Sequence, residues 1–151
     1  NIGDEFNFVL TDPHSLQSKA FPNIFVIGDA TNTPASQAGA VAHFEADTVI
    51  ENIMRTMNGR EIVQTFDGHA NCFIETGHGK AILVDFNYTQ EPLPGKYPLP
   101  YIGPFSLLKE SKINHMGKLA FEWIYWNMIV KAIPIPFIHA KMSLAGKERK
   151  V

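Results

Sequence analysis

Hydrophobic residues in the first third of the chain occur in two patterns, which together predict a strand, a turn and a helix. Residues 24–28 (IFVIG) form a continuous apolar run after a Pro-Asn pair, as is typical of a buried strand in a mostly parallel sheet. Apolar residues then recur at helical spacing (Ala42, Ala46, Val49, Ile50, Ile53 and Met57). Thr33 suits the N-cap, Pro34 suits the first helical position and Gly59 marks the end.

The middle of the chain changes to short β-rich runs. Residues 61–66 (EIVQTF), 71–76 (NCFIET) and 80–86 (KAILVDF) predict three strands, and the turn TGHG at 76–79 joins the last two. We expect a small antiparallel meander. Five prolines in residues 91–104 then exclude a helix or an interior strand and predict a rigid extended connection.

The last third predicts two helices, over residues 105–114 and 118–132. The second (KLAFEWIYWNMIVKA) is shorter than the roughly 20 apolar residues that a spanning helix needs, so it can lie on a membrane but not cross it. Its polar residues fall on two nearly opposite sides, which suggests that one side meets protein and another lipid. The predicted fold is α+β: a truncated Rossmann-like strand, turn and helix (1–59), a β-meander with its connection (60–104) and a helical membrane-binding tail (105–151).

Composition allows one ordinary globular domain, because 45% of the residues are apolar. The net charge of −2 argues against a nucleic-acid-binding protein. From Ser106 onwards, however, the sequence contains eight Lys or Arg and three Glu, which gives this part a net charge of +5. The rest of the chain therefore carries a net charge of −7. A basic, apolar tail on an acidic body is typical of a protein seated on anionic lipid, although it also suits a face that meets another part of the same protein.

Several features limit the chemistry. Cys72 is the single cysteine, so no disulfide can form within the chain. The six histidines show no metal-ligand spacing, and no G-x-S-x-G elbow occurs, so we predict neither a metal site nor a serine hydrolase. The chain begins without Met and with the texture of a domain interior, which suggests a fragment.

A strand that ends in Gly28-Asp29 and leads into a helix is suited to hold a dinucleotide. Glycine lets a ligand approach the backbone, a carboxylate can accept a hydrogen bond from a sugar or ribityl hydroxyl, and a helix N-terminus offers unpaired N–H groups. Alone, this pair occurs in many plain turns.

The longer string at 21–53 (FPNIFVIGDATNTPASQAGAVAHFEADTVIENI) resembles the second flavin-contacting segment of the two-dinucleotide-binding-domain flavoprotein reductases, and its PAS-x-AG-x-x-AHF portion resembles sulfide:quinone oxidoreductase. The resemblance implies FAD as cofactor, with Asp29 on the ribityl chain. It places the helix start, with Ser36, Ala38 and Gly39, before the isoalloxazine ring. The family commonly has Lys where this chain has Gln37.

Cys72 taken alone reads as a small apolar residue of a strand, sharing a face with Ile74 while Phe73 lies on the other. Residues 65–94, however, are similar to the stretch of sulfide:quinone oxidoreductase that carries a redox cysteine before a glycine turn. The resemblance implies that Cys72 is one of a catalytic pair that bridges sulfur, accepts sulfide and passes electrons to the flavin, and that its partner lies upstream of this chain. A thiolate is the reactive form.

Residues 107–131 are similar to a family segment with a lysine near the flavin, which Lys109 matches; its ammonium would stabilise negative charge on the flavin or on a quinone oxygen. Phe73 and Ile74 are candidates for an apolar wall beside the quinone ring. Aromatic and apolar residues of the tail are candidates for membrane contact: Phe121, Trp123, Ile124, Tyr125, Trp126 and Ile129.

The resemblance implies oxidation of sulfide to zero-valent sulfur or polysulfide, with electrons passing through FAD to quinone, in a protein bound peripherally to the cytoplasmic membrane of a bacterium. Homo-oligomer formation stays open, and the isolated chain is expected to be inactive. Three alternatives stay open: a flavocytochrome sulfide dehydrogenase subunit, a type II NADH:quinone reductase, and a non-catalytic module that anchors to a membrane.

Overall fold

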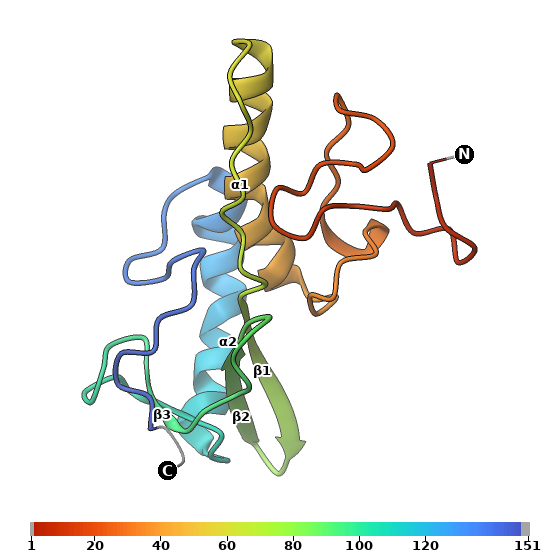
Figure 1. Cartoon of the computed structure of the whole chain (residues 1–151). Coiled ribbons are helices and arrows are strands. Elements are labelled where there is room, and N and C mark those ends of the chain that lie inside the picture. Colours follow the sequence, from red (N-terminus) through yellow and green to blue (C-terminus); the bar gives the residue numbers. More distant parts are fainter. Residues whose placement is uncertain (1, 149–151) are drawn as a thin grey trace. The chain divides into compact units, whose positions relative to one another are not determined.

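The computed structural model describes residues 2–148 and shows an α+β protein (Figure 1). Asn1, Arg149 and Lys150, the last two counted in the basic tail, lie outside the described residues. Within them are two α-helices, α1 (Gly39–Met57) and α2 (Lys112–Asn127), and four strands, β1 (Ala70–Gly77), β2 (Lys80–Phe86), β3 (Gly95–Tyr97) and β4 (Phe105–Leu107). Two short 3-10 helices, η1 (Gly28–Ala30) and η2 (Ile129–Lys131), complete the description.

The chain folds into two compact units. Unit 1 holds the described residues up to Ala70, together with Phe86–Gln90 and Ala140–Met142. Unit 2 holds Asn71–Asp85, Glu91–His139 and the described residues from Ser143. The helix α1 belongs to unit 1, and the sheet and α2 belong almost wholly to unit 2. The three parts expected from the sequence stay a prediction.

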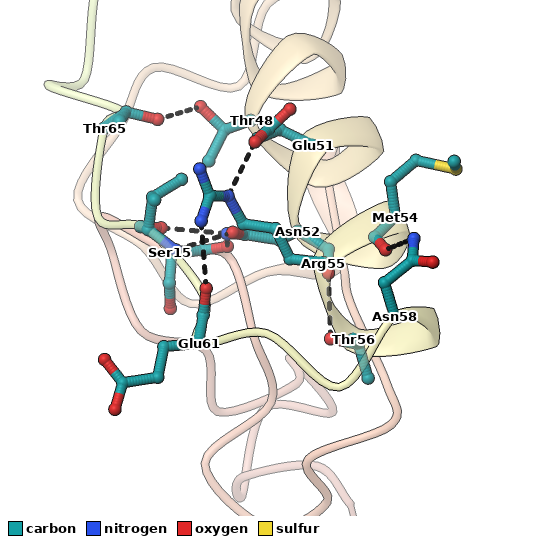
Figure 2. Close-up of polar contacts among 11 residues, drawn as sticks. Ser15, Thr48, Glu51, Asn52, Met54, Arg55, Thr56, Asn58, Glu61 and Thr65 are labelled. Carbon is teal, nitrogen blue, oxygen red and sulfur yellow. Dashed lines mark hydrogen bonds and ion pairs between the residues drawn. The ribbon is translucent and has the colours of Figure 1, made fainter.

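Helix α1 is held in unit 1 by one buried stripe that recurs at helical spacing. The stripe consists of Val41, Phe44, Glu45, Thr48 and Asn52. Asn52 is fully buried, and its carboxamide donates to the carbonyls of Ser15 and Val63 at 2.9 Å each and accepts the N–H of Val63 at 2.8 Å. Thr48 contacts Thr65 at 3.1 Å between hydroxyls (Figure 2). A polar helix face therefore organises the loops around it.

The expected start of this helix is wrong by several residues. The helix begins at Gly39 after Ala38, which makes no side-chain cap. Thr33 instead pairs its hydroxyl with that of Thr31 at 2.8 Å, so it is engaged in the preceding loop and not available as an N-cap. The expected end is confirmed, since the helix stops at Met57 and Gly59 adopts a φ of 64° in the left-handed region.

The strand expected at residues 24–28 does not form. Phe25 makes an isolated bridge with Gln17, residues 24–26 are half-buried and Ile27 is 38% exposed. A buried parallel strand needs continuous hydrogen-bonded neighbours on both sides. In the described part of unit 1 before α1, such pairing is limited to isolated bridges, so a Rossmann-like sheet is not confirmed.

The hairpin expected in the middle of the chain is confirmed, but the antiparallel meander is wrong. Strands β1 and β2 are neighbours joined by Gly77, His78 and Gly79, all with positive φ. The sheet order is β1-β2-β4-β3, with β4 parallel to β2 and antiparallel to β3. Residues 61–66 form no strand, because both backbone groups of Val63 pair with the side chain of Asn52.

The proline-rich segment forms no helix, as expected, but it contains the short strand β3. This strand lies at one edge of the sheet. Prolines are tolerated there, because an edge strand needs hydrogen bonds to a neighbouring strand on one side only. The connection is therefore part of the sheet and not only a spacer.

The helix expected at 105–114 is wrong over most of its length, whereas the helix expected at 118–132 is confirmed over residues 118–127 and starts earlier, at Lys112. Residues 105–107 form β4, and Ser111 caps α2 by accepting the N–H of Asn114 at 3.0 Å. The buried Asn114 also donates to the carbonyls of Ser106 and Lys109, which fixes the turn between strand and helix. No helix in the described part of the chain has the length and apolar content needed to cross a bilayer.

Candidate functional site

The Gly28-Asp29 turn of unit 1 is held at both backbone groups of its glycine. Gly28 has a φ of 66°, a backbone conformation that favours glycine. Space is not the constraint, because a Cβ added there would meet Ala42 at an ordinary contact distance of 3.6 Å. Its N–H donates to Glu45 Oε2 at 2.7 Å, and its carbonyl accepts both the N–H and the hydroxyl of Thr31 at 3.2 Å. Asp29 is exposed, so its carboxylate is available to a ligand.

Glu45 is a buried acidic residue that the sequence reading missed. It is 1% exposed and lies on the inner stripe of α1. Burial raises the pKa of its carboxyl group and the charge of Asp29 adds to this rise, while the hydrogen bond from Gly28 opposes it. An acidic residue in the middle of a predicted apolar helix face was the signal that could have found it.

The start of α1 is open. Gly39 is exposed, and a Cβ added to it would meet nothing within 4 Å. Ser36 and Ala38 are half-buried, and the N–H of Ala38 donates to the carbonyl of Ser36 at 2.9 Å. An accessible helix N-terminus beside an exposed carboxylate fits the flavin segment that the resemblance implies. Asp29 would hold ribityl hydroxyls, and the N–H groups of α1 would face negative charge on the ring.

Cys72 lies in β1 of unit 2 as a half-buried free thiol. Burial raises the pKa of this thiol, which lowers the fraction of reactive thiolate at neutral pH. Ile74, on the same face of the strand, is 50% exposed. Cys72 therefore lies on the same face as an exposed apolar side chain, and its burial disfavours the thiolate.

The residues expected at the quinone site take different positions in unit 2. Phe73 packs edge-on against Phe105, with 5.5 Å between ring centroids, whereas Ile74 points to the opposite face of β1. Lys109 is exposed in the turn between β4 and α2. The structure thus does not place Phe73 and Ile74 on one surface.

Helix α2 turns one side to the sheet and leaves an apolar stripe exposed. A Cβ added at Gly117 would lie 2.3 Å from Phe105, which shows how closely helix and sheet pack. The exposed stripe, called the α2 stripe, recurs every three or four residues and consists of Ile113, Met116, Leu119, Trp123 and Trp126, each 55–67% exposed. Ile113 and Met116 were missed in the sequence reading because the helix was expected to start at residue 118, and Leu119 was missed although it lies inside that expected helix.

The remaining residues expected at the membrane divide between exposed and half-buried positions. Tyr125 is 43% exposed and contacts Trp126 edge-on, with 5.0 Å between ring centroids. Phe121, Ile124 and Ile129 are half-buried. Of the six residues expected at the membrane, exposure therefore favours Trp123, Tyr125 and Trp126.

The polar side of α2 faces the hairpin. His115 contacts Glu75 at 2.9 Å and Lys118 lies 3.4 Å from the same carboxylate, which lowers the pKa of Glu75. In residues 2–148, no three His, Cys, Asp or Glu side chains lie close enough together to hold a metal ion. The prediction of no metal site stays a prediction.

Three curated relatives of the chain carry the same name. Sulfide:quinone oxidoreductase, mitochondrial, of Schizosaccharomyces pombe is 32% identical over 136 residues, covering 87% of this chain and 28% of the relative. The proteins of the same name from Mus musculus and Dictyostelium discoideum are each 30% identical, covering 86% and 82% of this chain and 28% and 26% of their own lengths. The chain thus spans little more than a quarter of these relatives.

No protein-family model matches the chain. Among solved structures, a chain in the cryo-EM structure of the Tetrahymena thermophila mitochondrial ATP synthase F1Fo composite tetramer is similar, with a TM-score of 0.59 and 24% identity. The similarity covers 87% of this chain and 29% of that one, and it shows the fold alone. The resemblance to sulfide:quinone oxidoreductases expected from residues 21–53 and 65–94 is confirmed by the curated relatives, to which the chain is similar over the part that it spans.

Proposed function

We propose that this chain contributes to an enzyme that oxidises sulfide to zero-valent sulfur and reduces a quinone to the quinol. The observation that carries the proposal is the sequence relationship to three proteins of that name over 82–87% of the chain. Sulfide gives up two electrons and the quinone takes up two electrons and two protons, so the overall reaction balances. FAD would accept the electron pair and pass it on.

Unit 1 would supply one wall of the flavin site. The exposed carboxylate of Asp29 is an acceptor for ribityl hydroxyls, and the open N-terminus of α1 favours negative charge at its end. Because unit 1 would form only one wall of the binding site of a large cofactor, we expect the 151 residues by themselves to bind FAD weakly or not at all. The absorption spectrum of the purified chain would test this, and a stoichiometric flavin band would contradict it.

Unit 2 would supply the sulfur-exchanging thiol. Where a sulfur atom bridges Cys72 to its partner cysteine, attack by hydrosulfide on the bridge forms one S–S bond, breaks another and releases a cysteine thiolate. The pKa of Cys72 is raised by burial in this chain. A positive charge near the thiol would favour the thiolate, and we expect the whole enzyme to supply it.

The α2 stripe would seat the enzyme on a membrane, where a hydrophobic quinone is found. Exposed tryptophans suit the headgroup region, and the neighbouring apolar residues can enter the acyl boundary. The relatives are named as mitochondrial proteins, and the bacterial origin expected for this chain stays a prediction. Quinone, sulfide, the membrane surface and any homo-oligomer are thus partners proposed for the whole enzyme.

The decisive experiment uses the full-length enzyme and the substitution Cys72→Ser. We expect loss of sulfide-dependent quinone reduction with retention of bound flavin, because the hydroxyl cannot carry sulfur while the flavin wall of unit 1 is unchanged. Ser143→Ala, an exposed change elsewhere in unit 2, is the control. Wild-type turnover in Cys72→Ser would remove the catalytic role.

The same assay separates the alternatives. Electron delivery to a haem protein in place of quinone would favour a flavocytochrome dehydrogenase. Quinone reduction by NADH that does not need Cys72 would favour a type II NADH:quinone reductase. Absence of flavin and of both activities would favour a non-catalytic anchoring module.

A further inference from the structure

Glu45 is a buried carboxyl group that the proposed reaction does not yet use. It belongs to the buried stripe of α1, which also holds Val41 and Phe44, and it is 1% exposed. Burial of a carboxylate is unfavourable unless hydrogen bonds compensate, and a well-packed apolar side chain is often as stable or more stable at such a place. A packing role therefore does not account for an acid at this position.

The partner of Glu45 is the backbone of the candidate flavin turn. Its Oε2 accepts the N–H of Gly28 at 2.7 Å across a separation of 17 residues. A hydrogen bond to an ionised acceptor is stronger than a neutral one. The helix thereby fixes the residue that immediately precedes Asp29.

The other backbone group of Gly28 is fixed from the opposite side of the turn. Its carbonyl accepts from the N–H and from the hydroxyl of Thr31, which closes η1. Gly28 stays in the left-handed region with a φ of 66°, and Asp29 is left exposed on the short 3-10 turn. The backbone that leads into Asp29 is thus held by the contacts of Gly28 with Glu45 and Thr31.

We propose that Glu45 is a positioning residue for FAD: its carboxylate holds the Gly28 backbone so that Asp29 is directed towards the ribityl hydroxyls. The inference rests on the proposed function and deepens it. Glu45 itself touches no cofactor in this arrangement. Its effect passes entirely through Asp29, which makes the two residues energetically coupled.

The test measures the FAD dissociation constant of the full-length enzyme, after removal and re-addition of flavin, for Glu45→Leu, Glu45→Gln and Asp29→Ala. Glu45→Leu removes the acceptor of the Gly28 N–H and is expected to weaken FAD binding ~10–100-fold, because a buried donor is left without its partner. Glu45→Gln keeps a carbonyl oxygen that can accept from Gly28, so we expect affinity within ~3-fold of wild type. If Glu45→Leu does not fold, Glu45→Ala is measured in its place.

Two comparisons distinguish positioning from general stability. Thr48→Ala, on the same buried stripe but bonded to Thr65, is expected to leave the dissociation constant unchanged. In the Asp29→Ala background, Glu45→Leu is expected to add little further loss, because the group that it positions is gone. Additive losses, or an equal loss in Thr48→Ala, would overturn the proposal in favour of a structural role.

The outcomes also separate this inference from the function on which it rests. Full FAD affinity in Glu45→Leu, in an enzyme that binds FAD and oxidises sulfide, overturns the role of Glu45 alone. A wild-type enzyme that binds no FAD overturns both.

Discussion

Lys147 and Asp85 form an ion pair inside unit 2, with 2.5 Å between Nζ and Oδ2 and side chains that are 3% and 2% exposed. The ammonium group also donates to the carbonyl of Ser143, and Lys147 bridges to Gly95 at the sheet edge. The pair therefore ties the last described residues to the interior of the sheet.

Lys147→Ala leaves the carboxylate of Asp85 buried without its cation, so we expect the free energy of unfolding to fall by about 3–5 kcal/mol. Lys80→Ala, which breaks the exposed pair with Glu110, is the control and should cost no more than about 1 kcal/mol. Urea denaturation measures both. Equal losses in the free energy of unfolding would show that burial does not make the Lys147–Asp85 pair more important for stability than the exposed pair.

Asn52→Ala should lower the free energy of unfolding by about 2–3 kcal/mol, because the N–H and C=O of Val63 and the carbonyl of Ser15 lose their buried partner. Asn58→Ala, at the exposed end of α1, is a matched change and should cost much less. A loss below about 0.5 kcal/mol for Asn52→Ala would mean that water replaces the amide at no cost.

Glu45→Gln should stabilise the protein increasingly as pH rises. The pKa of Glu45 is raised in the folded protein, so the proton favours folding below the unfolded pKa of about 4.3, and this contribution is lost as pH rises through the folded pKa. Glutamine does not titrate. Urea midpoints between pH 4 and pH 7 should therefore diverge, and a constant difference over this range would contradict the raised pKa.

Cys72 should be alkylated slowly at neutral pH in the folded chain. Burial raises the pKa of the thiol, so the thiolate fraction is lower at every pH below that value, and the midpoint of the rate profile should shift above the roughly 8.5 of a free cysteine. The same chain unfolded in urea is the reference. A folded midpoint below that of the unfolded chain would reveal an activating charge near the thiol.

Trp123→Ala with Trp126→Ala should weaken binding of the full-length enzyme to vesicles that contain anionic lipid by ~10-fold or more, because two exposed aromatic anchors of the α2 stripe are removed. Met57→Ala is the control, since Met57 is 76% exposed on α1 but lies outside that stripe. Vesicle co-sedimentation measures binding. An equal loss in the control would point to general stickiness of exposed apolar residues.

Local sequence determined the elements whose pattern is strong within a few residues. The helical body of α1 and its stop at Gly59, and the β1-β2 hairpin with its glycine turn, follow from side-chain period and backbone preference. The apolar spacing did not identify the buried face of α1, because Ile50, Ile53 and Met57 are exposed. The sequence around Asp29 and Cys72 also indicated the relationship to sulfide:quinone oxidoreductases.

Tertiary structure decided what depends on partners distant in sequence. Residues 61–66 have a strand-like sequence, yet Asn52 takes both backbone groups of Val63; residues 105–107 suit a helix, yet Leu107 pairs with Leu83 and with Gly95. The sequence indicates only that Glu45 lies in a helix, and the fold brings its carboxylate to the N–H of Gly28. Backbone groups take the partner that the fold offers, because a buried N–H or C=O left unpaired costs more than any local preference supplies.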